Sequence, residues 1–121
     1  MIPHWKKLGR GRPTKRKPGT MNKLEAAWAG ELEALGVKGE LLWFQYEGMT
    51  LKLAPDTRYT PDFVWMDKEG NIVFDECKGW MEEAAFVRIK VAADKFPFRF
   101  RLIRKRLKRD GGGWDIKDIA A

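Results

Sequence analysis

The sequence predicts an α/β (α+β) domain in which a small mixed β-sheet is flanked by helices. An early stretch repeats apolar residues at helical spacing, and several short apolar runs bounded by glycine or polar residues follow it. A chain of 121 residues can form one hydrophobic core but not two. We therefore expect one domain with the element order α-β-β-β-α-β.

The first helix is expected from about Met21 to Leu35, with Thr20 or Asn22 as its cap and Gly36 as its end. Its buried face is indicated by residues three and four apart: Leu24, Ala27, Trp28, Leu32 and Leu35. Strands are expected at 41–47 and 49–53, and residues 55–59 are expected to form a loop. The tryptophans at 28, 43, 65 and 80 are expected in the core.

A tight β-hairpin is predicted next, because apolar residues 63–66 and 72–74 flank the short turn Lys68-Glu69-Gly70. With this three-residue loop, three pairs are directly opposed: Met66 with Ile72, Val64 with Phe74, and Asp62 with Glu76. Directly opposed residues have Cβ atoms roughly 5 Å apart. The two acids would then repel each other unless a cation lies between them.

Lys78 shares the face of Glu76, because side chains along a strand alternate with period 2. Two acids and a lysine would therefore end one apolar sheet face, which indicates a divalent-metal site. Oxygen ligands favour Mg²⁺ or Mn²⁺ over zinc. Asp75 is expected to point away from this site, and Cys77 to be a buried structural thiol.

A second helix is expected at 82–95 and a strand at 98–103. In that strand Phe98, Phe100 and Leu102 alternate with Arg99 and Arg101, so one face is expected to be core and the other basic. The glycines at 111–113 suggest a hinge before a short tail. The predicted organisation is a basic extended arm at 1–19, a folded domain at 20–110 and a tail at 111–121.

The net charge of +7 is concentrated in two blocks. The arm carries seven cations and no acid: Lys6, Lys7, Arg10, Arg12, Lys15, Arg16 and Lys17. The second block begins within the last predicted strand and runs past it: Arg99, Arg101, Arg104, Lys105, Arg106, Lys108 and Arg109. Two basic blocks around an acidic centre suit a nucleic-acid backbone held near a metal. No apolar run is long enough to span a membrane, and one cysteine fits a reducing cytoplasm.

Pro61-Asp62 with Glu76-x-Lys78 resembles the signature of the PD-(D/E)XK nuclease superfamily, and the element order resembles its restriction-endonuclease-like core. The likeness covers roughly residues 20–105 and is greatest to small phage-type endonucleases and Holliday junction resolvases. It implies Mg²⁺, replaceable by Mn²⁺, on Asp62, Glu76 and the carbonyl of Cys77. It also implies that Lys78 positions or activates the attacking water.

Other site residues are left with two interpretations. Glu25 matches a first-helix glutamate that is a further metal ligand in some members, or it is a solvated helix flank. Arg58 and Tyr59 touch the scissile phosphate, or they are a loop charge and a core residue. Lys90, more than Arg88, matches the basic helix residue of the family. Arg99 and Arg101 complete the expected DNA-binding set with the arm.

The expected function is that of a Mg²⁺-dependent DNA endonuclease that hydrolyses phosphodiester bonds, with a preference for branched or junction DNA. The alternative is a non-catalytic basic protein that binds DNA or RNA. The expected location is the cytoplasm, of a bacterial host if the chain is phage-encoded. A homodimer is left open, since Trp5, Trp114, Ile116 and Ile119 could be buried by a partner.

Overall fold

The computed structural model describes residues 19–78 and 83–120. Over these residues the chain forms two α-helices and seven strands. In chain order they are α1 (Lys23–Val37), β1 (Leu41–Tyr46), β2 (Leu51–Ala54), β3 (Thr57–Tyr59), β4 (Phe63–Asp67), β5 (Ile72–Cys77), α2 (Glu83–Lys95), β6 (Arg99–Lys105), a short 3₁₀ helix (Lys108–Asp110) and β7 (Trp114–Asp118). Of the basic arm predicted at 1–19, residues 1–18 lie outside the described residues.

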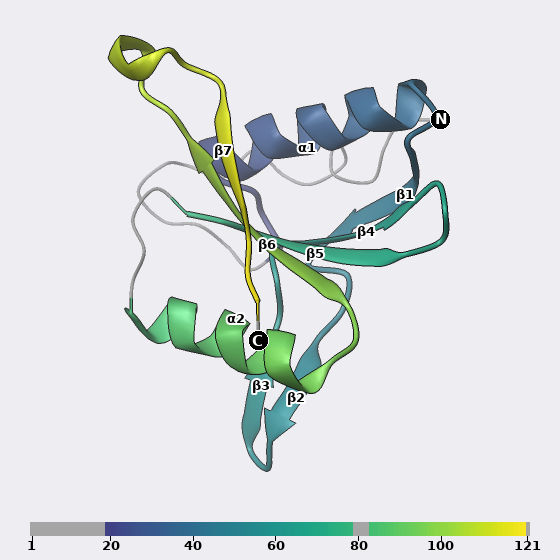
Figure 1. Cartoon of the computed structure of the whole chain (residues 1–121), viewed down its shortest axis with the longest axis vertical. Coiled ribbons are helices and arrows are strands. Elements are labelled where there is room, and N and C mark those ends of the chain that lie inside the picture. Colours follow the sequence, from purple (N-terminus) through teal and green to yellow (C-terminus); the bar gives the residue numbers. More distant parts are fainter. Residues whose placement is uncertain (1–18, 79–82, 121) are drawn as a thin grey trace.

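A five-stranded sheet in the order β1-β4-β5-β6-β7 forms the centre, with α1 on one face and α2 on the other (Figure 1). Only the β5–β6 pair is parallel, and the other neighbours are antiparallel. The predicted class, a mixed sheet flanked by helices, is therefore confirmed. Neither described helix is long and apolar enough to cross a membrane.

Helix α1 begins with a reciprocal cap. The Asn22 side chain accepts from the Glu25 N–H at 2.8 Å, and the Glu25 carboxylate accepts from the Asn22 N–H at 2.9 Å. The predicted end at Gly36 is wrong, because the helix continues to Val37. The left-handed backbone that reverses the chain is instead supplied by Gly39, at φ 79°.

The β4–β5 hairpin has the predicted register, with Met66 opposite Ile72 and Val64 opposite Phe74. Its turn is stabilised by the Asp67 carboxylate, which accepts from the N–H groups of Glu69 and Asn71. Gly70 adopts φ 88°, which glycine reaches without steric cost. The turn residues and the alternation thus select one register, and that register places the two acids.

Residues 55–59, expected to be a loop, contain a strand. Thr57–Tyr59 pairs with β2 as an antiparallel hairpin, and Asp56 at its tip has φ 62°. In Figure 1 this two-stranded sheet extends beyond the main sheet on the side of α2. Leu51 and Leu53 anchor it in the core below that helix.

The expected tail is also part of the sheet. Trp114–Asp118 pairs antiparallel with β6, and the glycines at 111–113 form the turn region between the two strands with positive φ. Trp114 packs edge-on against Trp28 with ring centroids 5.0 Å apart, and Ile119 is buried. Two of the side chains suggested for a partner are therefore used inside the fold.

Two hydrophobic cores lie on opposite faces of the sheet. Under α1 the core includes Trp28, Leu32, Phe63, Trp65 and Val73. Under α2 it includes Val64, Phe74, Ile89, Phe100 and Leu102. Strands β4 and β5 are therefore buried on both faces, as in a three-layer arrangement.

The prediction that all four apolar tryptophans lie in the core is only partly right. Trp28 and Trp65 are buried, whereas Trp43 on the edge strand β1 is 40% exposed. Trp80 lies outside the described residues. Trp43 lies opposite Met66, and neither hydrophobic core includes it.

Candidate active site

Asp62 and Glu76 meet where β4 begins and β5 ends. Both are buried, with exposed fractions of 9% and 6%. The Asp62 Oδ2 accepts from the Cys77 N–H at 2.8 Å, and the Asp62 backbone N–H donates to the Glu76 carboxylate. The Asp62 carbonyl accepts from the Glu47 N–H at 2.7 Å. Backbone and side chain together therefore fix Asp62 beside Glu76.

Glu76 has two side-chain partners besides Asp62. The Tyr59 hydroxyl donates to its Oε1 at 2.8 Å, and the Lys78 Nζ lies 3.4 Å from its Oε2. Burial raises the pKa of Glu76, and these two partners act in the opposite direction. The Lys78 side chain is 33% exposed, so its ammonium links the buried acids to solvent.

Glu25 joins the cluster from α1. It is 2% exposed, and its Oε1 accepts from the Asn22 N–H and from the Tyr46 hydroxyl at 3.2 Å. The interpretation of Glu25 as a solvated flank is therefore wrong. Burial, the charges of Glu76 and Glu25, and a hydrogen bond to Glu25 raise the pKa of Asp62 to about 8.

The donor set of this cluster suits a hard divalent cation. Three buried acids act on one another, and Lys78 is the cation paired with them among the described residues. In the described part of the chain, no group of three or more His, Cys, Asp or Glu side chains is arranged to hold a metal ion. A metal would therefore rest on two carboxylates, completed by a backbone carbonyl and water. Asp62 and Glu76 are the residues present that fit that role.

The Cys77 thiol takes no part in this cluster. Its side chain is buried among the residues under α1, as the alternation along β5 predicted. Burial, followed by the neighbouring carboxylates, raises the pKa of the thiol. A thiol held protonated in this way is a poor nucleophile.

Tyr59 is both a core residue and a site residue. Its ring is 5% exposed beneath α2, while its hydroxyl orients Glu76. Burial and the Glu76 charge raise its pKa, and the charge of Arg88 opposes them. The charge of Arg88, on α2, therefore reaches Tyr59, and the Lys90 Nζ lies 5.4 Å from the centre of the Phe86 ring.

Arg58 lies on the projecting β2–β3 hairpin and is exposed. Directly opposite it is Lys52, also exposed. Two like charges facing each other across strands disfavour pairing unless an anion lies near them. The hairpin thus presents positive charge only a few residues from Asp62.

The two arginines expected on a basic face of β6 are both engaged in ion pairs. Arg101 is 8% exposed and binds Asp75 through Nε and Nη2, so the expectation that it faces solvent is wrong. Arg99 is exposed but pairs with Asp118 at 2.6 Å. The alternation of residues along β6 predicted that the face with Arg101 is open to water, but helix α1 packs on that face of the sheet.

The structure thus brings together Glu25, Asp62, Glu76 and Lys78 and adds two tyrosines that the motif did not include. Tyr46 was not predicted, since no local pattern links a strand tyrosine to a helix acid 21 residues earlier. The seven arm cations predicted to bind DNA lie outside the described residues. Comparison of the chain with protein-family models, with curated proteins and with solved structures finds no match.

Proposed function

We propose that this protein is a metal-dependent DNA endonuclease of the PD-(D/E)XK type, acting in the cytoplasm on branched or junction DNA. The observation that supports this most strongly is the convergence of Asp62 and Glu76, both buried, next to the partly exposed Lys78. A protein that only binds DNA gains nothing from buried acids facing a phosphate. A hydrolase needs them to hold a cation.

Each residue has a distinct role in this proposal. Asp62 and Glu76 would bind Mg²⁺ or Mn²⁺, with the Cys77 carbonyl as a further ligand and Glu25 behind Asp62. When bound, the metal supplies a polarised phosphate and a water of lowered pKa. Lys78 orients the water and stabilises negative charge that develops on the phosphate. Tyr59 keeps one Glu76 oxygen fixed, which leaves the other toward Lys78.

The surrounding charge supports a polyanionic substrate. Arg58 and Lys52 lie on the hairpin that leads into Asp62, and Arg88 acts on Tyr59 from α2. Phosphate contacts by such cations release counterions, so affinity falls as salt rises. Cations on two sides of the acid cluster suit a DNA strand that passes across it.

The test is cleavage of labelled junction, flap, nicked, duplex and single-stranded DNA in Mg²⁺, Mn²⁺ or EDTA. We expect wild-type cleavage with either metal and none in EDTA. Asp62→Asn and Glu76→Gln should lower the rate by at least about a thousandfold while DNA binding is kept, since loss of metal removes several kcal/mol of transition-state stabilisation. Glu69→Gln, an exposed acid in the same hairpin, is the matched control.

Metal binding provides an independent measurement. Mg²⁺ at a concentration well above its Kd should raise the melting temperature of the wild type and of Lys78→Met, since lysine is not a ligand. It should leave Glu76→Gln unchanged. Wild-type turnover in either acid variant would overturn the assignment of Asp62 and Glu76 as the metal ligands. DNA binding without cleavage of any substrate would favour the non-catalytic alternative.

A further inference from the structure

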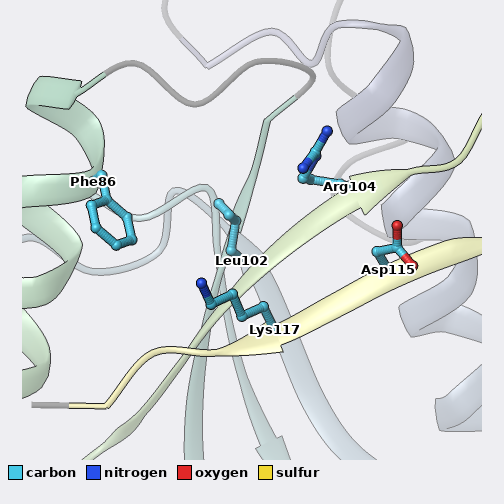
Figure 2. A pocket seen from close by; sticks show the side chains of 5 residues that line it. All are labelled: Phe86, Leu102, Arg104, Asp115 and Lys117. Atoms are coloured by element: carbon cyan, nitrogen blue, oxygen red, sulfur yellow. The ribbon is translucent and has the colours of Figure 1, made fainter.

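A cavity of about 370 Å³ opens on the α2 face of the sheet, beside the acid cluster. Figure 2 shows its lining: Phe86 from α2, Leu102 and Arg104 from β6, and Asp115 and Lys117 from β7. The volume falls in the lower part of the range typical of small-ligand sites. None of these residues has a role in the proposed hydrolysis.

The strand registers connect this cavity to the catalytic residues. Glu76 pairs with Leu102, and Leu102 pairs with Lys117, so the three lie in one row across the sheet. The Lys78 N–H donates to the Ile103 carbonyl at 3.0 Å, which continues the pairing and brings Lys78 beside Arg104. Two strand spacings, about 10 Å, separate Glu76 from Lys117. The cavity is therefore the next position along the sheet from the proposed scissile phosphate.

An aromatic ring between cations is the chemical feature of the cavity. The Lys117 Nζ lies 5.9 Å from the centre of the Phe86 ring, and the Lys90 Nζ lies 5.4 Å from it. In the described part of the chain, no carboxylate forms an ion pair with Lys90, Arg104 or Lys117. The one carboxylate of the lining, Asp115, lies 3.4 Å from the Arg106 Nη1. The positive charge at the ring is thus left for a ligand.

We propose that this cavity binds one unpaired nucleotide of the strand that is cut. Its base stacks on Phe86, and its phosphate is held by Lys117 and Arg104. A base within a duplex is stacked on its neighbours and is not free to enter such a site, so the occupant must be unpaired or flipped out. The inference rests on the proposed nuclease function and adds to it the substrate class: DNA with an unpaired nucleotide next to the cleaved bond.

The probe is a DNA duplex with one unpaired 2-aminopurine, a base whose fluorescence falls when it stacks. Binding is measured in EDTA, so that no strand is cut. We expect wild type and Phe86→Tyr to quench the fluorescence. Phe86→Leu should not quench it and should bind about tenfold or more weakly, since stacking is lost. Val87→Ala, an exposed neighbour on α2, should behave as wild type.

The cation is tested separately, with a variant that removes charge and leaves the core unchanged. Lys117→Gln should make the slope of log affinity against log salt shallower by about one unit for the unpaired probe. Its binding to a fully paired duplex should change less. Lys38→Gln, at the far end of α1, is the matched charge control and should leave the preference for the unpaired probe unaltered.

Three outcomes would overturn the inference. One is equal quenching by wild type and Phe86→Leu, and another is equal preference of both proteins for bulged over paired DNA. A third is binding of the free 2-aminopurine deoxynucleotide, followed by its quenching, with the same affinity as the DNA probe. That result would identify a free nucleotide as the ligand. Metal-dependent cleavage by the wild type, lost in Asp62→Asn, would leave the proposed function standing in each case. If the wild type cleaves no substrate but quenches the probe as expected, the proposed hydrolysis is wrong and binding of an unpaired nucleotide in the cavity still stands.

Discussion

Asp75 and Glu76 are neighbours in β5, but they point to opposite faces of the sheet and have opposite surroundings. Asp75 is fully buried, and its Oδ2 accepts from the indole N–H groups of Trp28 and Trp65, each at 2.9 Å. Arg101 completes the set with two hydrogen bonds. This carboxylate therefore accepts four hydrogen bonds from three residues, one of them a cation.

The acids near Glu76 lie close to one another. Glu76 meets Asp62, and Asp62 meets Glu25, while Lys78 is the cation paired with this group among the described residues. The pKa of Asp62 is raised as a result. The comparison teaches that burial of an acid does not by itself indicate function. An acid that lies close to other acids, as Asp62 does, is the better candidate for a ligand site.

The largest effect on stability is expected from Asp75→Asn. This change leaves the Arg101 guanidinium buried without a counter-charge, and such losses typically cost about 3–5 kcal/mol. Urea unfolding followed by tryptophan fluorescence measures it. Glu76→Gln is the matched change on the other face and should be neutral or stabilising without metal. Equal destabilisation by both variants would show that the two faces do not differ in compensation.

The second effect is a pH dependence. The folded-state pKa of Asp62 is about 8, above its unfolded value, so the folded protein holds a proton that the unfolded chain releases. Stability from this group is complete below about pH 4 and is lost as pH rises toward 8. In EDTA the free energy of unfolding should therefore fall over this range by several kcal/mol, since each pKa unit corresponds to about 1.4 kcal/mol. Asp62→Asn should flatten the fall and be the more stable protein at pH 8. A profile that rises between pH 4 and pH 8 would contradict this assignment.

A smaller change is expected from Tyr59→Phe, which removes the hydroxyl that Glu76 accepts from. Loss of a hydrogen bond to a buried acid costs about 1–2 kcal/mol. The cleavage rate in Mg²⁺ should fall while the apparent Mg²⁺ affinity changes little, because Tyr59 orients Glu76 without being a ligand. A variant with normal rate would limit Tyr59 to packing under α2.

The smallest effect is expected from Arg99→Gln. The Arg99–Asp118 pair has a geometry as good as that of Arg101–Asp75, but both of its side chains are more than half exposed. Exposed pairs contribute about 1 kcal/mol or less, and salt screens them. Thermal melting at low and at high salt should show a small difference that disappears with salt. A loss as large as that of Asp75→Asn would mean that burial does not separate the two pairs.

The hairpin that holds the acids could be predicted because its determinants are local. The turn Lys68-Glu69-Gly70 and the alternation on either side fix the register, and with it the side to which each acid points. The first helix cap was predicted to be Thr20 or Asn22, and Asn22 is the cap in the structure. Asn22 and Glu25 lie three residues apart, which is the spacing of a capping box.

The failures all depend on contacts between distant segments. Arg101 alternates with apolar residues as an exposed strand residue would, but α1 covers its face and Asp75 binds it. The strand Thr57–Tyr59 is short and polar, and it is stabilised by packing of its hairpin under α2. Glu25 stood at the border of an amphipathic face, and its contacts with Tyr46 and Asp62 come from segments distant in the sequence.

The hydrogen bonds of Asp75 also have a consequence for the order in which the chain can fold. Its partners come from separate segments, one 47 residues earlier in α1 and one 26 residues later in β6. The β4–β5 hairpin is local and can form within microseconds once it leaves the ribosome. Until residue 101 has been synthesised, however, Asp75 has no cation, and burying it under α1 is unfavourable. Packing of α1 on the sheet is therefore expected to be completed late. It requires β6, which follows α2 in the chain and carries Arg101.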